Sequence, residues 1–292
     1  MILEPLAYRQ RFLFAARKSQ SNPLMYVFYF YDDAAVTDNT HLTELAKHLF
    51  AQRNHVNPNA DFDAFTAQNI DQAIIVQQKM AALNGHIAGW KCLVPQANDQ
   101  LIVAPILHAA EHGQQCGIIP TIKDETALAL IEPEIAFILG KDIEPYQHYT
   151  DDEIDSAISA THMALELIQN RFSRDSQPSY LQKLADGLSN QGVYIGPQIP
   201  KSVAYQASHV DVVVTANNQQ QSFNGKHPCE LPQLPVYWMI NYLAQKGIKL
   251  SAGQAIITGS YCGVVKVPMA TEVSIEYKDI GQFSVSFVDA LA

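Results

Sequence analysis

The hydrophobic pattern divides the chain into a helical first part and a strand-rich remainder. Residues 41–53 and 69–85 carry apolar side chains at helical spacing, so we predict two helices there, the second ending at Gly85. After Gly85 the pattern changes to short apolar runs separated by turn residues, which is typical of strands. The sequence therefore predicts an α+β protein whose helices come first.

The strand-rich part contains further elements with clear boundaries. The apolar run 128–140 predicts a strand. Residues 150–172 begin with Thr150 and Glu153 at the spacing of a capping box, so we expect one long helix there. Residues 234–247 predict a second helix. Short strands are expected at 192–197, 210–214 and 255–259, and a hairpin turning at 278–281 is expected within 271–288.

Composition narrows the class of protein. The 292 residues are 48% hydrophobic and 16% charged, which suits one large or two smaller domains with a sizeable core. The net charge of −10 argues against a nucleic-acid or anionic membrane partner, and no apolar run is long enough to span a membrane. Four cysteines without a CxxC pair indicate buried thiols and a cytoplasmic location. The run 23–31 loosely resembles a signal peptide, but a strand or an N-terminal extension fits it better.

Glu132 and Glu134 are the first candidates for chemistry. They flank Pro133 inside an apolar strand, and residues i and i+2 of a strand point to the same face. Two buried carboxylates side by side are costly unless they are protonated, paired or bound to a cation. A hard divalent cation such as Mg²⁺ would satisfy them. The alternative is a solvated edge strand, which Pro133 would also favour.

Three other features have both a functional and a structural interpretation. Glu166 either faces water or joins the two glutamates, if its segment packs beside their strand. Lys91 is either a surface lysine with a buried stem, or a cation for a substrate carboxylate or an acid/base. Residues 108–112 match the HxxEH zinc-protease pattern, but Gly113 would end the required helix, so a solvated turn is favoured.

Five segments in series resemble the 2-keto-4-pentenoate hydratase branch of the fumarylacetoacetate hydrolase superfamily. The similarity covers about residues 41–292, and the second and third segments together are the most specific. The segments are GWKCLV (89–94), IEPEIAFILGKDI (131–143), ALELIQNR (164–171), LADGLSNQGVYIG (184–196) and IITGSYCGVVKV (256–267).

The resemblance implies a fold, a metal site and a set of active-site residues. The fold would be a mixed β-roll or sandwich with flanking helices, with an N-terminal extension and helical region at 1–88 and a catalytic domain at 89–292. Mg²⁺ or Mn²⁺ would be held by carboxylates, and a 2-oxo acid would be the substrate. The implied metal ligands are Glu132, Glu134 and Glu166; the catalytic residues are Lys91 and Asp186; the substrate-binding residues are Ser189, Thr258 and Gly259.

The implied activity is hydration of a 2-hydroxy-2,4-dienoate in the degradation of aromatic or other carbon compounds, by a homo-oligomer. The alternatives are an acylpyruvate hydrolase, an oxo-acid decarboxylase, or a metal-binding relative without catalysis. The family's catalytic acid after the lysine strand has no direct counterpart in NDQLIVAPILHAA (98–110), where Asp99 is the candidate substitute. Residues 1–40 match no segment of the family.

Overall fold

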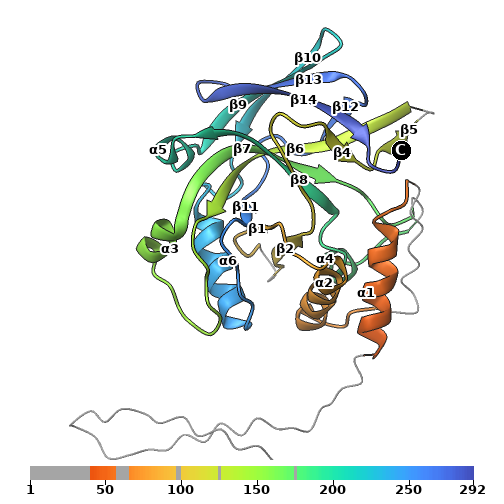
Figure 1. Cartoon of the computed structure of the whole chain (residues 1–292), viewed down its shortest axis with the longest axis vertical. Helices are drawn as coiled ribbons and strands as arrows, with labels where there is room; N and C mark the ends of the chain where they lie inside the picture. Colours follow the sequence, from red (N-terminus) through yellow and green to blue (C-terminus); the bar gives the residue numbers. More distant parts are fainter. Residues whose placement is uncertain (1–39, 57–65, 97–99, 124–125, 174–175) are drawn as a thin grey trace, which may run out of the picture. The chain divides into compact units, whose positions relative to one another are not determined.

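The computed structural model describes residues 40–56, 66–96, 100–123, 126–173 and 176–292 (Figure 1). The two helices expected first are present, as α1 (Thr40–Gln52) and α2 (Ile70–Asn84). Gly85 ends α2 in a left-handed conformation with φ of 86°, as the sequence predicted. Residues 1–39, including the run 23–31, lie outside the described residues.

The two helices form a small core of their own with later segments. The buried face of α1 packs against α2, and Leu107, Phe172 and Leu184 complete the cluster. The described residues between 40 and 292 form one compact unit. The proposed division into 1–88 and 89–292 stays a prediction. No helix of the described residues combines the length and the apolar character that crossing a membrane requires.

The larger of two sheets carries the candidate site. Among the described residues it has nine strands, in the order β2-β1-β11-β6-β7-β8-β3, with β12 and β5 also paired to β6. The bounds are β1 Gly89–Leu93, β2 Ile102–Ile106, β3 Ala109–Glu111, β5 Thr121–Lys123, β6 Thr126–Leu139, β7 Ile158–Ile168, β8 Asn190–Ile199, β11 Ala255–Ile257 and β12 Val265–Pro268.

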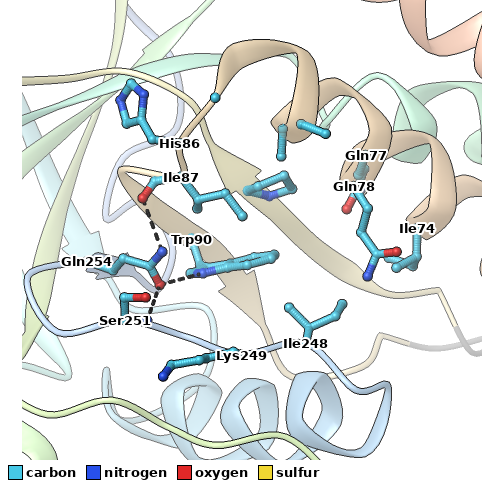
Figure 2. A pocket seen from close by; sticks show the side chains of 14 residues that line it. Ile74, Gln77, Gln78, His86, Ile87, Trp90, Ile248, Lys249, Ser251 and Gln254 are labelled. Carbon is cyan, nitrogen blue, oxygen red and sulfur yellow. Dashed lines mark hydrogen bonds between the residues drawn. The ribbon is translucent and has the colours of Figure 1, made fainter.

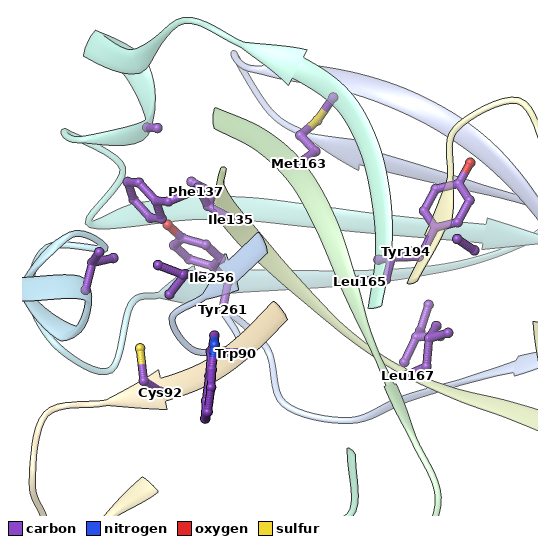
Figure 3. Packing of buried hydrophobic residues seen from close by; sticks show 14 of the residues in the cluster. Trp90, Cys92, Ile135, Phe137, Met163, Leu165, Leu167, Tyr194, Ile256 and Tyr261 are labelled. Atoms are coloured by element: carbon purple, nitrogen blue, oxygen red, sulfur yellow. The ribbon is translucent and has the colours of Figure 1, made fainter. Parts of the chain in front are cut away.

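The smaller sheet packs across one face of β6, β7 and β8 (Figure 1). Its order is β10-β9-β13-β14-β4, and β13 and β14 form the predicted hairpin. Phe137, Leu165 and Tyr194 of the larger sheet point into the core (Figure 3). Phe283 of the smaller sheet stacks on Tyr194, so side chains of both sheets fill the space between them. The α+β fold is therefore confirmed. The bounds are β4 Cys116–Ile118, β9 His209–Ala216, β10 Gln219–Lys226, β13 Glu272–Tyr277 and β14 Gly281–Asp289.

The prediction of one long helix at 150–172 is wrong. The capping box of Thr150 and Glu153 does start a helix, but α3 covers Asp151–Ala157 alone, and β7 follows at once. The last six residues of β7 are all buried, because both faces of this strand are covered. The sequence of such a strand does not alternate between apolar and polar residues, so its pattern is equally compatible with a helix. Pairing with β6 and β8 decides the conformation.

The remaining helices are short, except one. The helix expected at 234–247 is confirmed as α6 (Leu234–Gln245). Two short helices, α4 (Tyr180–Ala185) and α5 (Lys201–Ala204), were not predicted. The turn favoured at 108–112 is wrong for Ala109–Glu111, which form strand β3 and pair with β8, but an exposed turn does begin at His112.

Candidate active site

The candidate site lies on one face of the central strand pair. Glu132 of β6 is directly opposite Glu166 of β7, and Glu134 follows two residues later on the same face. Oxygen atoms of the three carboxylates all lie within 4.8 Å of one another. The prediction that Glu132 and Glu134 project together is confirmed. The edge-strand alternative is wrong, because β6 has paired neighbours on both sides.

A gap beside β6 brings a loop onto the carboxylates. On one side, β11 pairs with the stretch 136–138 and β12 with 128–131, so no strand of the described residues covers the stretch between them. The loop joining β11 to β12 fills this gap, where the backbone N–H of Gly259 donates to Oε2 of Glu134 at 2.6 Å. Tyr261 N–H donates to Pro133 O at 3.1 Å, so Pro133 faces a loop there rather than a strand.

Gly259 is required at this position by its backbone and its surroundings. Its φ is +118°, a region that side chains rarely adopt. A Cβ on Gly259 would lie 2.6 Å from Cδ2 of Leu93 and 2.7 Å from Cγ of Pro228. Substitution would therefore push the loop away from Glu134 and lose the hydrogen bond that orients this carboxylate.

Two donors converge on a single oxygen of Glu166. Lys91 Nζ lies 2.6 Å from Oε1, and Asn190 Nδ2 donates to the same atom at 2.9 Å. The side chains of Lys91 and Glu166 are 12% and 1% exposed, so this ion pair is largely removed from water. Asn190 is a site residue that the sequence analysis missed. Its buried Oδ1 has no partner among the described groups.

The site carries an excess of negative charge. Burial and the neighbouring Glu166 raise the pKa of Glu132 to about 7, and burial with both other glutamates raises the pKa of Glu134. Burial alone would lower the pKa of Lys91, but the three carboxylates outweigh it and raise this pKa. One ammonium thus faces three carboxylates. A set of hard oxygen ligands with uncompensated charge fits a hard divalent cation.

These residues line one cavity of about 350 Å³. Its polar members are the three carboxylates, Lys91 and Ser260, and Lys91 is the one cationic side chain among the described residues that line it. The rest of its wall is mainly apolar, which leaves a hydrophobic compartment next to the charged groups. The apolar wall comprises Leu93, Ile102, Leu188, Pro228 and Ile257.

Asp186 is buried behind this cavity rather than in its wall. Its carboxylate accepts from Nε of Arg171 at 2.7 Å and from Nη2 at 2.9 Å, and both side chains are 0% exposed. The next three residues, Gly187, Leu188 and Ser189, all have positive φ, from 56° to 86°. Leu188 O then accepts from Lys91 Nζ at 3.4 Å. Asp186 reaches the site through this loop.

The other predicted site residues fall in different places. Gly259 lines the cavity, whereas Ser189 and Thr258 are not among its described lining residues. Thr258 is fully buried, and its Oγ1 lies 3.4 Å from Nε2 of His227. Asp99 lies outside the described residues. The assigned roles of Asp186, Ser189 and Thr258 stay predictions.

Two further features are the cavity beside Trp90 and the segment 108–112. The cavity of Figure 2 lies beside Trp90, and the side-chain amide of Gln254 at its wall is engaged by Trp90, Ser251 and Ile87. At 108–112, Nδ1 of His112 lies 3.1 Å from the hydroxyl of Tyr194. Within the described residues, the three glutamates are the one cluster of potential metal ligands, so the zinc pattern is not matched by a site.

Comparison with known proteins agrees with the fold. A model of the fumarylacetoacetate (FAA) hydrolase C-terminal domain matches residues 92–288, a range that includes all three glutamates and begins directly after Lys91. The chain belongs to the FAA hydrolase family. The resemblance inferred from the five sequence segments is confirmed.

Relatives within the FAA hydrolase family include enzymes with different names. A 2-keto-4-pentenoate hydratase of Paraburkholderia xenovorans is 25% identical over 255 residues, covering 84% of this chain and 94% of that protein. A 4-oxalocrotonate decarboxylase of a Pseudomonas species is 27% identical over 164 residues, covering 53% of this chain and 59% of that protein.

A solved structure shares the fold. The 4-oxalocrotonate decarboxylase from Pseudomonas putida G7, complexed with magnesium and adipate, superposes with a TM-score of 0.66. Its sequence is 18% identical, and the match covers 87% of this chain and 99% of that protein. At this identity the likeness establishes the FAA hydrolase fold over most of the chain.

Proposed function

We propose that the protein is a divalent-metal-dependent hydro-lyase that hydrates 2-hydroxy-2,4-dienoates of the 2-keto-4-pentenoate type. The observation that carries this proposal is the convergence of three glutamates and Lys91 in one cavity. The hydratase of P. xenovorans, which aligns over most of both chains, supports the reaction type.

Mg²⁺ or Mn²⁺ is the proposed cofactor, held by Glu132, Glu134 and Glu166. The same fold in P. putida has been crystallised with magnesium and with calcium, which supports a hard divalent ion. When bound, the ion would supply a Lewis acid that draws electron density from the substrate's 2-oxo group. Gly259 N–H and Asn190 Nδ2 hold two of the carboxylates in fixed orientations before any ligand arrives.

Lys91 is the proposed partner of the substrate's carboxylate and the candidate for proton transfer. Its Nζ borders the cavity and stays protonated, because the glutamates raise its pKa. A bound carboxylate would compete with Glu166 for this ammonium, and Nζ could then hold or deliver a proton at the substrate. The apolar wall formed by residues such as Ile102 and Leu188 would exclude water from the hydrocarbon tail.

The charge of the cavity supports a substrate with one carboxylate. Lys91 is the single cation among the described lining residues, and the remainder of the wall is apolar. A second carboxylate at the far end of a dicarboxylic substrate would find no cation in this part of the chain, and its desolvation would be costly. A short dienoate with an uncharged end fits better.

The second candidate is an oxo-acid decarboxylase or an acylpyruvate hydrolase of the same superfamily. The named decarboxylase relative and the decarboxylase fold support it. All three reactions need the same electron sink, so the carboxylate cluster serves each of them. A metal-binding relative without catalysis is the third candidate, and a catalytic role for Asp99 would argue against it.

A substrate panel tests the proposal. We expect the purified protein with Mn²⁺ or Mg²⁺ to consume 2-hydroxypenta-2,4-dienoate, followed by the loss of dienol absorbance, and to require the metal. Glu134→Gln should abolish turnover, while Glu272→Gln, which alters an exposed glutamate on β13, should leave it unchanged. Faster turnover of 4-oxalocrotonate, oxaloacetate or an acylpyruvate would favour the second candidate. Absence of turnover with all of them would favour the third.

The remaining assignments are proposals that follow from the same family. We expect Asp186 to act as a positioning residue, through the loop that carries Leu188 O to Lys91. Ser189 and Thr258 remain predicted substrate-binding residues. A homo-oligomer in the cytoplasm, with no nucleic-acid or membrane partner, remains the expected setting.

A further inference from the structure

A second polar cavity, separate from the carboxylate site, has a volume of about 280 Å³. Its described wall comes from chain segments that are distant in sequence: the end of α1, the residues around the end of α2, the connection from β2 to β3, β4 with the residue after it, the start of β8 and the residue after β14. Three basic side chains, Arg53, His86 and His108, line it. No aspartate or glutamate is among its described lining residues.

Arg53 is the one arginine among the described residues that line this basic cavity. Its guanidinium has no ion-pair partner within the described ranges, unlike Arg171, which is neutralised by Asp186. Burial and the nearby Arg171 lower the pKa of Arg53 to about 9, and the carboxylate of Asp186, which is paired with Arg171, offsets only part of this. Burial, His86 and Arg53 likewise lower the pKa of His108. In both groups burial is the largest cause, and neighbouring positive charge adds to it.

Neutral amides hold the walls of the cavity in place. Asn84 Nδ2 donates to His86 O and to Leu107 O, both at 3.0 Å, which ties together the two segments that carry the histidines. Gln191 accepts from Ile119 N–H at 2.8 Å and donates to Ile168 O at 2.9 Å. The basic groups are therefore presented by a pre-formed frame, which lowers the cost of binding.

We propose that this cavity is a binding site for a small oxyanion, a carboxylate or phosphate group, with Arg53 as its principal ligand. A guanidinium presents its donors in a planar fork that matches two oxygens of such a group. His86 and His108 would add a hydrogen bond each from opposite segments. The site is independent of the proposed hydratase reaction, since it shares no lining residue with the carboxylate cavity.

Calorimetry on metal-free protein, treated with a chelating resin because a soluble chelator is itself an oxyanion, tests this proposal. Inorganic phosphate and acetate are titrated separately, and the one that binds tighter identifies the class. We expect saturable binding of at least one anion to the wild type. Arg53→Gln should weaken it by about tenfold or more, the loss of one charge-assisted contact.

Matched variants make the result decisive. Lys47→Gln removes one positive charge from an exposed site on α1, outside the cavity, and should leave the affinity unchanged. His108→Gln changes an exposed histidine of the cavity wall and should also weaken binding, so it serves as the test if Arg53→Gln fails to fold. Equal affinity in wild type and either cavity variant, or no saturable binding of either anion, would overturn the proposal.

Discussion

The two polar cavities have opposite charge, and two successive residues at the start of β8 contribute to them. Asn190 donates to Glu166 in the carboxylate cavity, while the next residue, Gln191, lines the basic cavity. Successive residues of a strand point to opposite faces, so Asn190 and Gln191 contribute to different cavities. The first cavity has three carboxylates against one lysine; the second has an arginine and two histidines without an acid among its described lining residues.

The difference lies in how the charged groups are held. Glu134 and Glu166 each receive a short hydrogen bond from a fixed backbone or amide donor, so their oxygens are oriented before a ligand binds. Arg53 has no such partner among the described residues, so its donors remain available to a ligand. Oriented charge is what a reaction centre needs, whereas available charge suffices for a binding pocket.

The largest expected effect is on turnover, from replacing the lysine of the carboxylate cavity. Lys91→Met should lower kcat by about 100- to 10,000-fold, the range for losing an acid–base group. Mn²⁺ affinity should not fall, because the substitution removes a positive charge beside the ion's ligands. Turnover assays and calorimetry on the same preparation separate the two effects. Retained turnover, or a loss of metal binding, would contradict the role given to Lys91.

The next effect is on stability, at the ion pair behind the loop. Arg171→Met leaves Asp186 buried without a partner, and should lower the free energy of unfolding by about 3–5 kcal/mol in urea titrations. The double variant with Asp186→Leu should recover part of this loss. Lys249→Met, which breaks exposed pairs, is the control and should cost less than about 1 kcal/mol. If Arg171→Met also lowered the free energy of unfolding by less than about 1 kcal/mol, the buried ion pair would not be needed for stability.

The pH dependence of stability should reveal the crowded carboxylates. Glu132 titrates at about 7 in the folded chain against 4.5 for an ordinary glutamate, so the folded state binds more protons between these values. The free energy of unfolding of metal-free protein should therefore fall as pH rises from 4.5 to 7, by about 3 kcal/mol from this group. Saturating Mg²⁺ or the variant Glu132→Gln should flatten this slope. A slope unchanged by both would rule out the crowding.

The smallest expected effect concerns Asn190, the amide donor to Glu166. Asn190→Ala removes the amide that orients Glu166, and should weaken Mn²⁺ binding by about 10-fold. Asn224→Ala, on the exposed strand β10, is the matched control. Calorimetry gives both affinities. Identical affinities for the two variants would show that Lys91 alone is enough to orient this carboxylate.

Much of the site was predictable because it depends on local rules. The alternation of a strand placed Glu132 and Glu134 on one face, and family motifs added Glu166 and Lys91. The helix caps at Gly85 and Thr150 were also predictable, since their chemistry is local. β7 was not, because a strand buried on both faces lacks the alternation that marks a strand.

Other features depend on contacts that sequence spacing does not encode. Asn190 reaches Glu166 after three consecutive residues with positive φ, of which two are not glycine. The partner of Asp186 was missed because Arg171 precedes α4 in the sequence and Asp186 follows it, so no short-range spacing pairs them. Arg53, His86 and His108 of the basic cavity come from separate segments of the chain, so no local sequence pattern predicts that they lie together.

Metal titration tests the central claim most directly. Calorimetry of Mn²⁺ into metal-free protein should show one site per chain, with affinity reduced by about 100-fold or more in Glu134→Gln and unchanged in Glu272→Gln. Binding that persists in Glu134→Gln at wild-type affinity would contradict the account, because the three glutamates would then not form the metal site.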